Sequence, residues 1–260
     1  HSVGFCVNDI TEFGNLSMLD GITAAARDRG YAVTLMEISK NQNFSLEEAT
    51  RAMSALPVDG VIFGMSRLAP DFEEFTPLAG LPSVIVSMYA HPRCTTVDSD
   101  QYRCALTLME HFFSYGHREI RYVAGPEFSV DEVFRQAGWR DALQERGLAV
   151  VEPTRGDWSA NSGYEAACQM LEHDHDFTAV FAANDQMANG IICALRDHGL
   201  RVPEDVSVVG VDDSLVDYVP NCQLTTVRFD MSERGRTAFE HAVPEDPANN
   251  QVVAVRIPGK

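Results

Sequence analysis

The stretch of sequence that decides the fold of this chain reads Gly-Asp-Trp-Ser-Ala-Asn-Ser-Gly at residues 156–163. Two further stretches follow it in order: Ala-Asn-Asp-Gln-Met-Ala at 183–188 and Ser-Val-Val-Gly-Val-Asp-Asp at 207–213. Each places a stacking or hydrogen-bonding side chain just after an apolar strand pattern or just before a helix pattern. In an α/β protein, ligands bind at those ends of the sheet. The three stretches therefore predict a site for a small polyol, in which an indole, a carboxamide and a carboxylate converge.

Outward from these stretches, strand and helix patterns alternate along nearly the whole chain, which indicates an α/β fold with parallel sheets. Expected strands lie at 3–7, 32–38, 58–63, 83–86, 120–124, 178–182, 206–211, 224–227 and 251–257. Expected helices run from 16 to 30, from 45 to 55, from 105 to 116, from 131 to 146, from 162 to 171, from 187 to 199 and from 231 to 241. The second and fifth of these helices would begin at Ser-x-x-Glu capping boxes, with Ser45 and Ser162 as the capping residues.

Composition excludes several classes of protein. The 260 residues carry a net charge of −18, so this chain by itself should not bind the phosphate backbone of DNA. No apolar run approaches the roughly 18 residues that span a membrane. No signal peptide is visible at the first residues, although a signal or a whole domain could precede them. The six scattered cysteines lack any Cys-x-x-Cys pair, which is typical of buried, reduced thiols in a cytosolic protein.

Metal and enzyme chemistry are not indicated. The run His-Asp-His-Asp at 173–176 could chelate a metal, but its position after a helical pattern favours a solvated helix end. No Gly-x-Gly-x-x-Gly, phosphate-binding loop or Gly-x-Ser-x-Gly elbow appears, and no nucleophile–base pair is evident. We therefore expect no cofactor, no metal and no catalytic residue.

Three residues are the first candidates for ligand contacts. The indole of Trp158 can pack on the apolar face of a sugar ring, although a core tryptophan is the alternative. The carboxamide of Asn184 can both donate to and accept from hydroxyls, but it could instead cap the following helix. The carboxylate of Asp212 can accept from two neighbouring hydroxyls, or it could be a turn residue.

In the order and spacing of several motifs, the chain resembles the effector-binding core of LacI/GalR-type transcriptional regulators, which share the type I periplasmic sugar-binding protein fold. The resemblance runs from residue 97 to about 227. Besides the three stretches already quoted, it is carried by Tyr-Gly-His-Arg at 115–118, Ala-Gly-Pro at 124–126, Ala-Gly-Trp at 137–139, Gly-Leu-Arg-Val at 199–202 and Leu-Thr-Thr at 224–226.

The resemblance implies two doubly wound parallel-sheet lobes joined by a multi-strand hinge, with a ligand between them. The first lobe would comprise 1–98 plus 230–243, and the second 99–229 plus 244–260. It further implies a homodimer in the cytoplasm whose small-molecule effector, a neutral sugar, changes its affinity for operator DNA. DNA contact would come through an N-terminal helix-turn-helix domain that this chain lacks, and no membrane partner is expected.

The resemblance also adds candidate site residues. Arg135 stands where the family places a ligand-contacting arginine, and Asp131, one helical turn earlier, could pair with it. In the first lobe, Gly64 and Ser87 replace polar residues found in the family's lactose-responsive member. Glu12 and Phe13 occupy the first loop, and Phe229 replaces a glutamine. The two phenylalanines suit a second stacking surface, whereas Glu12 and Asp131 disfavour an anionic ligand.

Two other functions remain open. The same fold serves periplasmic sugar-binding proteins that feed transporters, although the unpaired cysteines and the stretch at 207–226 favour the regulator. A regulator that responds to nucleobases is the other alternative within the family.

Overall fold

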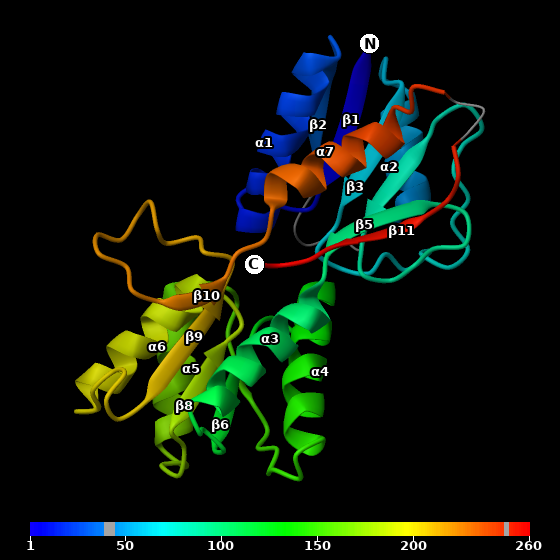
Figure 1. Cartoon of the computed structure of the whole chain (residues 1–260). Coiled ribbons are helices and arrows are strands. Elements are labelled where there is room, and N and C mark those ends of the chain that lie inside the picture. The colour runs from blue at the N-terminus through cyan, green and yellow to red at the C-terminus, as the bar shows by residue number, and fades with distance from the viewer. Residues whose placement is uncertain (39–44, 247–249) are drawn as a thin grey trace. The chain divides into compact units, whose positions relative to one another are not determined.

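The computed structural model describes residues 1–38, 45–246 and 250–260. The chain divides into two compact units, which are taken one at a time below (Figure 1). Unit 1 comprises His1–Asp100 and Asp230–Ile257. Unit 2 comprises Gln101–Phe229 and Pro258–Lys260. Each unit contains one parallel sheet with helices on both faces, so the predicted α/β fold class is confirmed.

The sheet of unit 1 has six strands in the order β11-β5-β4-β3-β1-β2. Their bounds are β1 Ser2–Val7, β2 Ala32–Glu37, β3 Gly60–Gly64, β4 Ser83–Val86, β5 Thr95–Ser99 and β11 Ala254–Ile257. Its helices are α1 Phe13–Asp28, α2 Leu46–Ser54 and α7 Met231–Ala242. Helices α1 and α7 pack side by side over one face of the sheet, and α2 covers the other (Figure 1).

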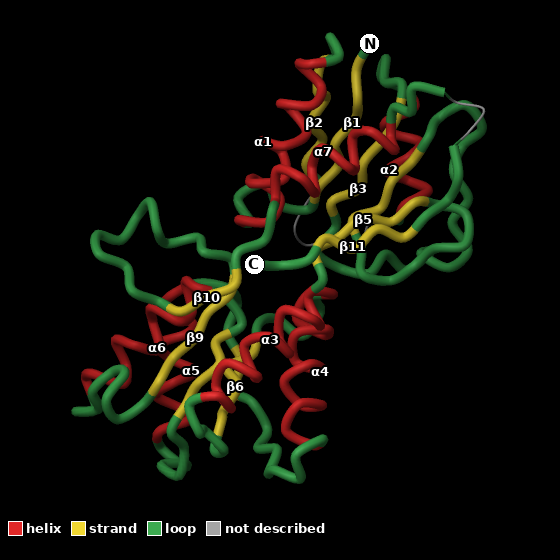
Figure 2. The backbone as a smooth tube through the Cα atoms, viewed as in Figure 1, coloured by secondary structure: helices red, strands yellow, loops and turns green. Residues whose placement is uncertain are grey.

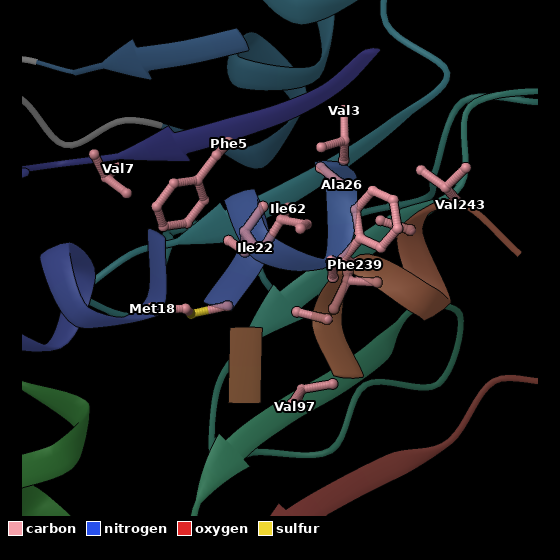
Figure 3. Packing of buried hydrophobic residues seen from close by; sticks show 14 of the residues in the cluster. Val3, Phe5, Val7, Met18, Ile22, Ala26, Ile62, Val97, Phe239 and Val243 are labelled. Atoms are coloured by element: carbon pink, nitrogen blue, oxygen red, sulfur yellow. The ribbon is translucent and has the colours of Figure 1, made fainter. Parts of the chain in front are cut away.

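The two faces of this sheet follow from the alternation of side chains along a strand. Val3, Phe5 and Val7 of β1 point toward α1 and α7, where Figure 3 shows them beside Ile22 and Phe239. The intervening Cys6 belongs to a second cluster, formed with α2. Because both faces are covered, the inner strands β1, β3 and β4 are apolar almost throughout, as is expected of parallel sheets.

The sheet of unit 2 has five strands in the order β10-β9-β8-β6-β7. Their bounds are β6 Ile120–Ala124, β7 Thr154–Arg155, β8 Ala179–Ala182, β9 Ser207–Val211 and β10 Thr225–Val227. The helices are α3 Gln101–Ser114, α4 Val130–Gln144, α5 Ala160–Leu171 and α6 Asp185–Asp197. Helix α3 packs beside α4 and α5 beside α6, and Figure 2 shows the two pairs on opposite sides of the strands. Right-handed crossovers require α4 on one face and α5 and α6 on the other, because the strand order reverses at β7.

Several details differ from the sequence-based expectations. The final strand β11 pairs with β5 in the sheet of unit 1, so the assignment of 244–260 to the second lobe is wrong for this strand. Strands β5 and β7 were not anticipated. Helix α5 begins one turn before the expected Ser162, because Ser159 is its N-cap and accepts a hydrogen bond from the Ser162 amide at 3.1 Å. The cap at Ser45 is confirmed, with a 3.0 Å bond from the Glu48 amide.

Strand β5 was not predicted because its sequence, Thr-Thr-Val-Asp-Ser, is mostly polar. All five of its residues are nevertheless buried. Its Asp98 accepts a 2.9 Å hydrogen bond from Arg234 of α7, and the two side chains are 3% and 5% exposed. A buried carboxylate of this kind is tolerated when it is paired. None of the described helices is long and apolar enough to cross a membrane.

Candidate functional site

The three residues first singled out in the sequence follow three strands of unit 2. Trp158 comes after β7, Asn184 after β8 and Asp212 after β9. These strands are parallel, so the three residues lie at the same edge of the sheet, beyond the carboxyl ends of the strands. In open α/β sheets this edge is where ligands bind.

Arg135 of α4 joins this group from the interior. Its side chain is 4% exposed, and one of its terminal nitrogens, Nη2, lies 3.6 Å from Oδ1 of Asp212. Its guanidinium carbon lies 5.6 Å from the centre of the Trp158 ring, within the range of a cation–π contact. Arg135 is therefore not a solvated surface arginine. We call Arg135, Trp158, Asn184 and Asp212 the unit 2 cluster.

Two further bonds fix the orientation of Arg135. Its Nε donates to Oε1 of Gln101 at 2.8 Å, and its Nη1 donates to the carbonyl of Ala183 at 2.7 Å. Burial disfavours the charge on Arg135, but the carboxylates of Asp212 and Asp131 outweigh burial and raise the pKa of Arg135. The guanidinium is thus a fixed cation at the edge of the sheet.

Asn184 is the N-cap of α6. Its Oδ1 accepts from the Met187 amide at 2.9 Å, and its Nδ2 donates to the carbonyl of Trp158 at 3.0 Å. The capping role considered for Asn184 is therefore what this structure shows. A carboxamide has two N–H donors and two acceptor lone pairs on its oxygen. These contacts use one of each, which leaves Asn184 able to bond a hydroxyl as well.

The backbone of the cluster is strained at two of its members. Trp158 has φ 79° and Asp212 has φ 104°, a region that L-residues rarely adopt. Such conformations cost about 1–3 kcal/mol each and concentrate at ligand sites, where the surroundings hold them in place. The position of the Trp158 ring shows how: a Cβ added at Gly125 would lie 2.5 Å from its Cζ3 and Cη2 atoms, so the ring rests directly on the backbone of Gly125.

Asp185, the first residue of α6, is a buried acid next to the cluster residue Asn184. Its Oδ1 accepts from the Thr226 hydroxyl at 2.7 Å and its Oδ2 from the Ser214 amide at 2.8 Å. It thereby ties α6 to β10 and to the loop after β9. Burial, with the nearby charges of Asp212 and Asp213, raises its pKa to about 7 against the effect of these hydrogen bonds.

Two predicted site residues of unit 2 take other positions. Asp131 is half-buried in the first turn of α4 and acts on Arg135 through its charge. Phe229 is only 4% exposed. Its ring lies against Gly259, where an added Cβ would be 3.2 Å from it, and the two residues form an isolated bridge. Phe229 therefore packs within unit 2, and its stacking on a ligand stays a prediction.

The remaining predicted positions belong to unit 1. Glu12 precedes α1 as its N-cap residue, and Phe13 is the first residue of that helix. Gly64 has no side chain to contact a ligand, and the Phe5 ring comes within 2.8 Å of where an added Cβ would be. Ser87 accepts a bond from the Tyr89 amide at 3.0 Å. The ligand contacts of Glu12 and Phe13 stay predictions.

The cluster has the chemistry of a binding site. An aromatic face, a carboxylate, a carboxamide and a fixed cation offer stacking together with both kinds of hydrogen-bonding group. In the part of the chain that the structure describes, no group of three or more His, Cys, Asp or Glu side chains could hold a metal ion. Asp174, in the His-Asp-His-Asp run at 173–176, forms an ion pair with Arg121.

Comparisons with known proteins agree on the class of protein. Residues 109–256 match the family model of the periplasmic binding protein-like domain. The catabolite control protein A of Priestia megaterium is 29% identical over 242 residues, which are 92% of this chain and 73% of that protein. The lactose operon repressor of Escherichia coli K12 is 40% identical over 134 residues, 51% of this chain and 37% of the repressor.

Solved structures are similar over the whole chain. A transcriptional regulator CelR–cellobiose complex has a TM-score of 0.85 at 28% identity, and the match covers 100% of this chain and 82% of that one. A dimeric lac repressor with a C-terminal deletion has a TM-score of 0.87 at 25% identity, with 100% and 96% covered. This chain belongs to the LacI family of transcriptional regulators, and it carries the periplasmic binding protein-like, effector-binding core of that family.

Proposed function

We propose that this core binds a small neutral carbohydrate and that binding changes the DNA affinity of the full regulator, a non-enzymatic protein of the cytoplasm. The observation that carries the proposal is the unit 2 cluster, in which Arg135 touches both Asp212 and the Trp158 ring. Asp212 and Asn184 suit hydroxyl groups, and the indole suits the apolar face of a sugar ring. The complex of the similar regulator CelR contains cellobiose.

The charge balance of the cluster favours a neutral ligand. Asp212 already compensates Arg135, and Asp131 adds a second carboxylate close enough to raise the pKa of Arg135. A sugar phosphate or sugar acid would add negative charge next to these two carboxylates. A neutral polyol can instead bond to both members of the Arg135–Asp212 pair without leaving a buried charge unpaired.

A thermal-shift screen tests this proposal, followed by calorimetry with any ligand found. A ligand that binds only the folded state stabilises it by about 2.7 kcal/mol at 100 times its Kd, which raises the Tm by several degrees. We expect a shift with neutral mono- or disaccharides that Trp158→Ala and Asp212→Asn abolish. Tyr218→Ala and Asp217→Asn, two exposed positions in the loop after β9, are the matched controls.

Other outcomes of the screen contradict parts of the proposal. Shifts with purine nucleobases alone would assign the core to nucleobase-responsive regulators. Shifts with sugar phosphates alone would contradict the charge argument at Arg135. A sugar that binds Trp158→Ala as tightly as the unaltered protein would remove the unit 2 cluster from the site.

The proposed assembly is a homodimer formed through unit 2. A groove of about 680 Å³ runs along this unit, with Ile192 of α6 and the loop residues Leu215, Val219 and Leu224 in its wall. A second copy of this chain is the occupant that we propose, because the lac repressor that shares the fold is dimeric. Operator binding would then require a DNA-binding domain in each copy.

A further inference from the structure

Glu132, in the first turn of α4, is a buried acid that the proposed sugar contacts do not use. Its side chain is 1% exposed. Its Oε2 accepts two hydrogen bonds, from the Tyr122 hydroxyl at 2.9 Å and from the Gly125 amide at 2.8 Å. Its Oε1 is buried and has no hydrogen-bond partner among the described residues. A buried carboxylate oxygen without a hydrogen-bond partner destabilises the fold, so the presence of Glu132 at this position needs an explanation.

The bond to Gly125 connects Glu132 to the unit 2 cluster. Gly125 follows β6, and the Trp158 ring lies so close that no Cβ fits between them. Arg155 of β7 holds the other end of the same residue, because its Nη1 donates to the Gly125 carbonyl at 3.2 Å. Glu132 and Arg155 together therefore hold the Gly125 backbone on which the indole rests.

The same helix carries Arg135, which meets the indole, and Glu132, which bonds the glycine on which the indole rests. Glu132 and Arg135 are three residues apart, so they lie on one side of α4. Glu132 ties α4 to the loop after β6, while Arg135 reaches the Trp158 ring at 5.6 Å. A shift of the Glu132–Gly125 bond would move the indole relative to its cationic neighbour.

We propose that Glu132 is a positioning residue for the ligand surface of unit 2: through the Gly125 amide it sets where the Trp158 indole lies against Arg135. The inference depends on the proposed ligand site for its functional meaning, but its structural content can be tested without any ligand.

The proposal has a consequence for pH. The groups that face Glu132 are Tyr122 of β6, Arg135 of its own helix and Arg155 of β7, and Cys104 of α3 lies near Tyr122. Burial raises the pKa of Glu132 to about 7, although its two hydrogen bonds and the two arginines act against burial. Above this pH the carboxylate accepts from the Gly125 amide more strongly, because charged acceptors form the stronger bonds. The indole should therefore respond to pH near neutrality.

Fluorine NMR of protein labelled with 5-fluorotryptophan measures this response. The chain has two tryptophans, so two resonances are expected, and Trp158→Phe assigns them. We expect the Trp158 resonance to move between pH 6 and 8 with a midpoint near 7, and to stay constant in Glu132→Gln. Exposed Glu127→Gln is the matched control. Asp185→Asn tests the other nearby acid with a pKa of about 7, and it should leave the midpoint in place.

A second variant distinguishes positioning from mere stability. Tyr122→Phe removes one bond that lowers the pKa of Glu132 but keeps the bond to Gly125, so the midpoint should rise. A Trp158 resonance that titrates in Glu132→Gln as it does in the unaltered protein would overturn the proposal. A Trp158 resonance that shows no change between pH 6 and 8 in the unaltered protein would also overturn it. Neither result depends on whether a sugar binds, so failure here and failure of the sugar screen are separate findings.

Discussion

Trp158 is held in an uncommon backbone conformation by contacts on three sides. Its ring rests on Gly125, its ring face meets Arg135 and its carbonyl accepts a 3.0 Å bond from Asn184. Each contact comes from a different segment of unit 2, so the φ of 79° is over-determined rather than accidental. Because the ring is fixed in advance, binding of the proposed ligand would carry a smaller entropic cost.

At the scale of one residue, we expect Gly125→Ala to displace the indole. The added methyl group would lie 2.5 Å from two atoms of the ring, too close for any real contact. Overpacking of this kind costs about 1–3 kcal/mol of stability. Urea unfolding should show this loss, and ligand affinity should fall together with a change in Trp158 fluorescence.

Gly14→Ala in α1 is the control, because its added Cβ would meet nothing closer than 3.5 Å. Equal behaviour of the two variants would contradict the close packing.

At the scale of elements, Asp185 is the residue that gathers the ends of α6, β9 and β10. It occupies the first position of α6, and it accepts from Thr226 of β10 and from Ser214 after β9. Gly210 of β9 must be glycine at this point, because an added Cβ would overlap the Asp185 carboxyl. One buried acid therefore sets the spacing of three elements that carry or flank Asp212.

The pKa of Asp185 predicts how stability depends on pH. The folded pKa of about 7 lies above the value of 3.8 for a free aspartate, so the folded state binds this proton more tightly than the unfolded state does. Its contribution to stability is therefore complete below pH 4 and is lost as pH rises toward 7. Between pH 5 and 7, this group should reduce the free energy of unfolding by about 2–3 kcal/mol.

Urea unfolding at several pH values tests this dependence. Asp185→Asn should flatten the decline between pH 5 and 7, whereas Asp217→Asn, an exposed position, should leave it unchanged. A decline that is as steep in Asp185→Asn as in the unaltered protein would show that Asp185 is ionised in the folded state at pH 5. Glu132 contributes a decline of the same sign through its own pKa of about 7.

At the scale of the whole molecule, the net charge of −18 affects how the chain associates with other molecules. Most of the chain repels both nucleic acid and other copies of itself, so association needs an apolar surface that outweighs this repulsion. The groove of unit 2 is the surface proposed for this association, and its wall includes Ile192 and Val219 beside Arg196.

Sedimentation equilibrium measures the proposed dimer. We expect Ile192→Asp to convert the purified chain from dimer to monomer without loss of fold, because it places an unpaired charge in the buried interface. Leu78→Asp, at a position of unit 1 that is 50% exposed, should stay dimeric. A dimer that persists in Ile192→Asp would assign the interface to another face of the chain.

Local patterns in the sequence were sufficient for most elements and for three of the four members of the unit 2 cluster. The alternation of apolar runs predicted nine of the eleven strands that the structure describes. The ends of two predicted strands indicated Asn184 and Asp212, and the start of a predicted helix indicated Trp158. The strand predictions succeed because side-chain periodicity is a property of adjacent residues. Arg135 was found only through the family resemblance, since nothing around it distinguishes it from a surface arginine.

What the sequence by itself determined is therefore the fold class, the order of most elements and the placement of Asn184 and Asp212 after neighbouring strands of one sheet. The tertiary structure decided the sheet that β11 joins, the burial of β5 and the partners of Arg135. It also decided the burial that raises the pKa of Glu132 and of Asp185 to about 7. The reason is physical: strand pairing, burial and electrostatic coupling depend on residues distant in the chain, and a local pattern carries no information about which distant residues will meet.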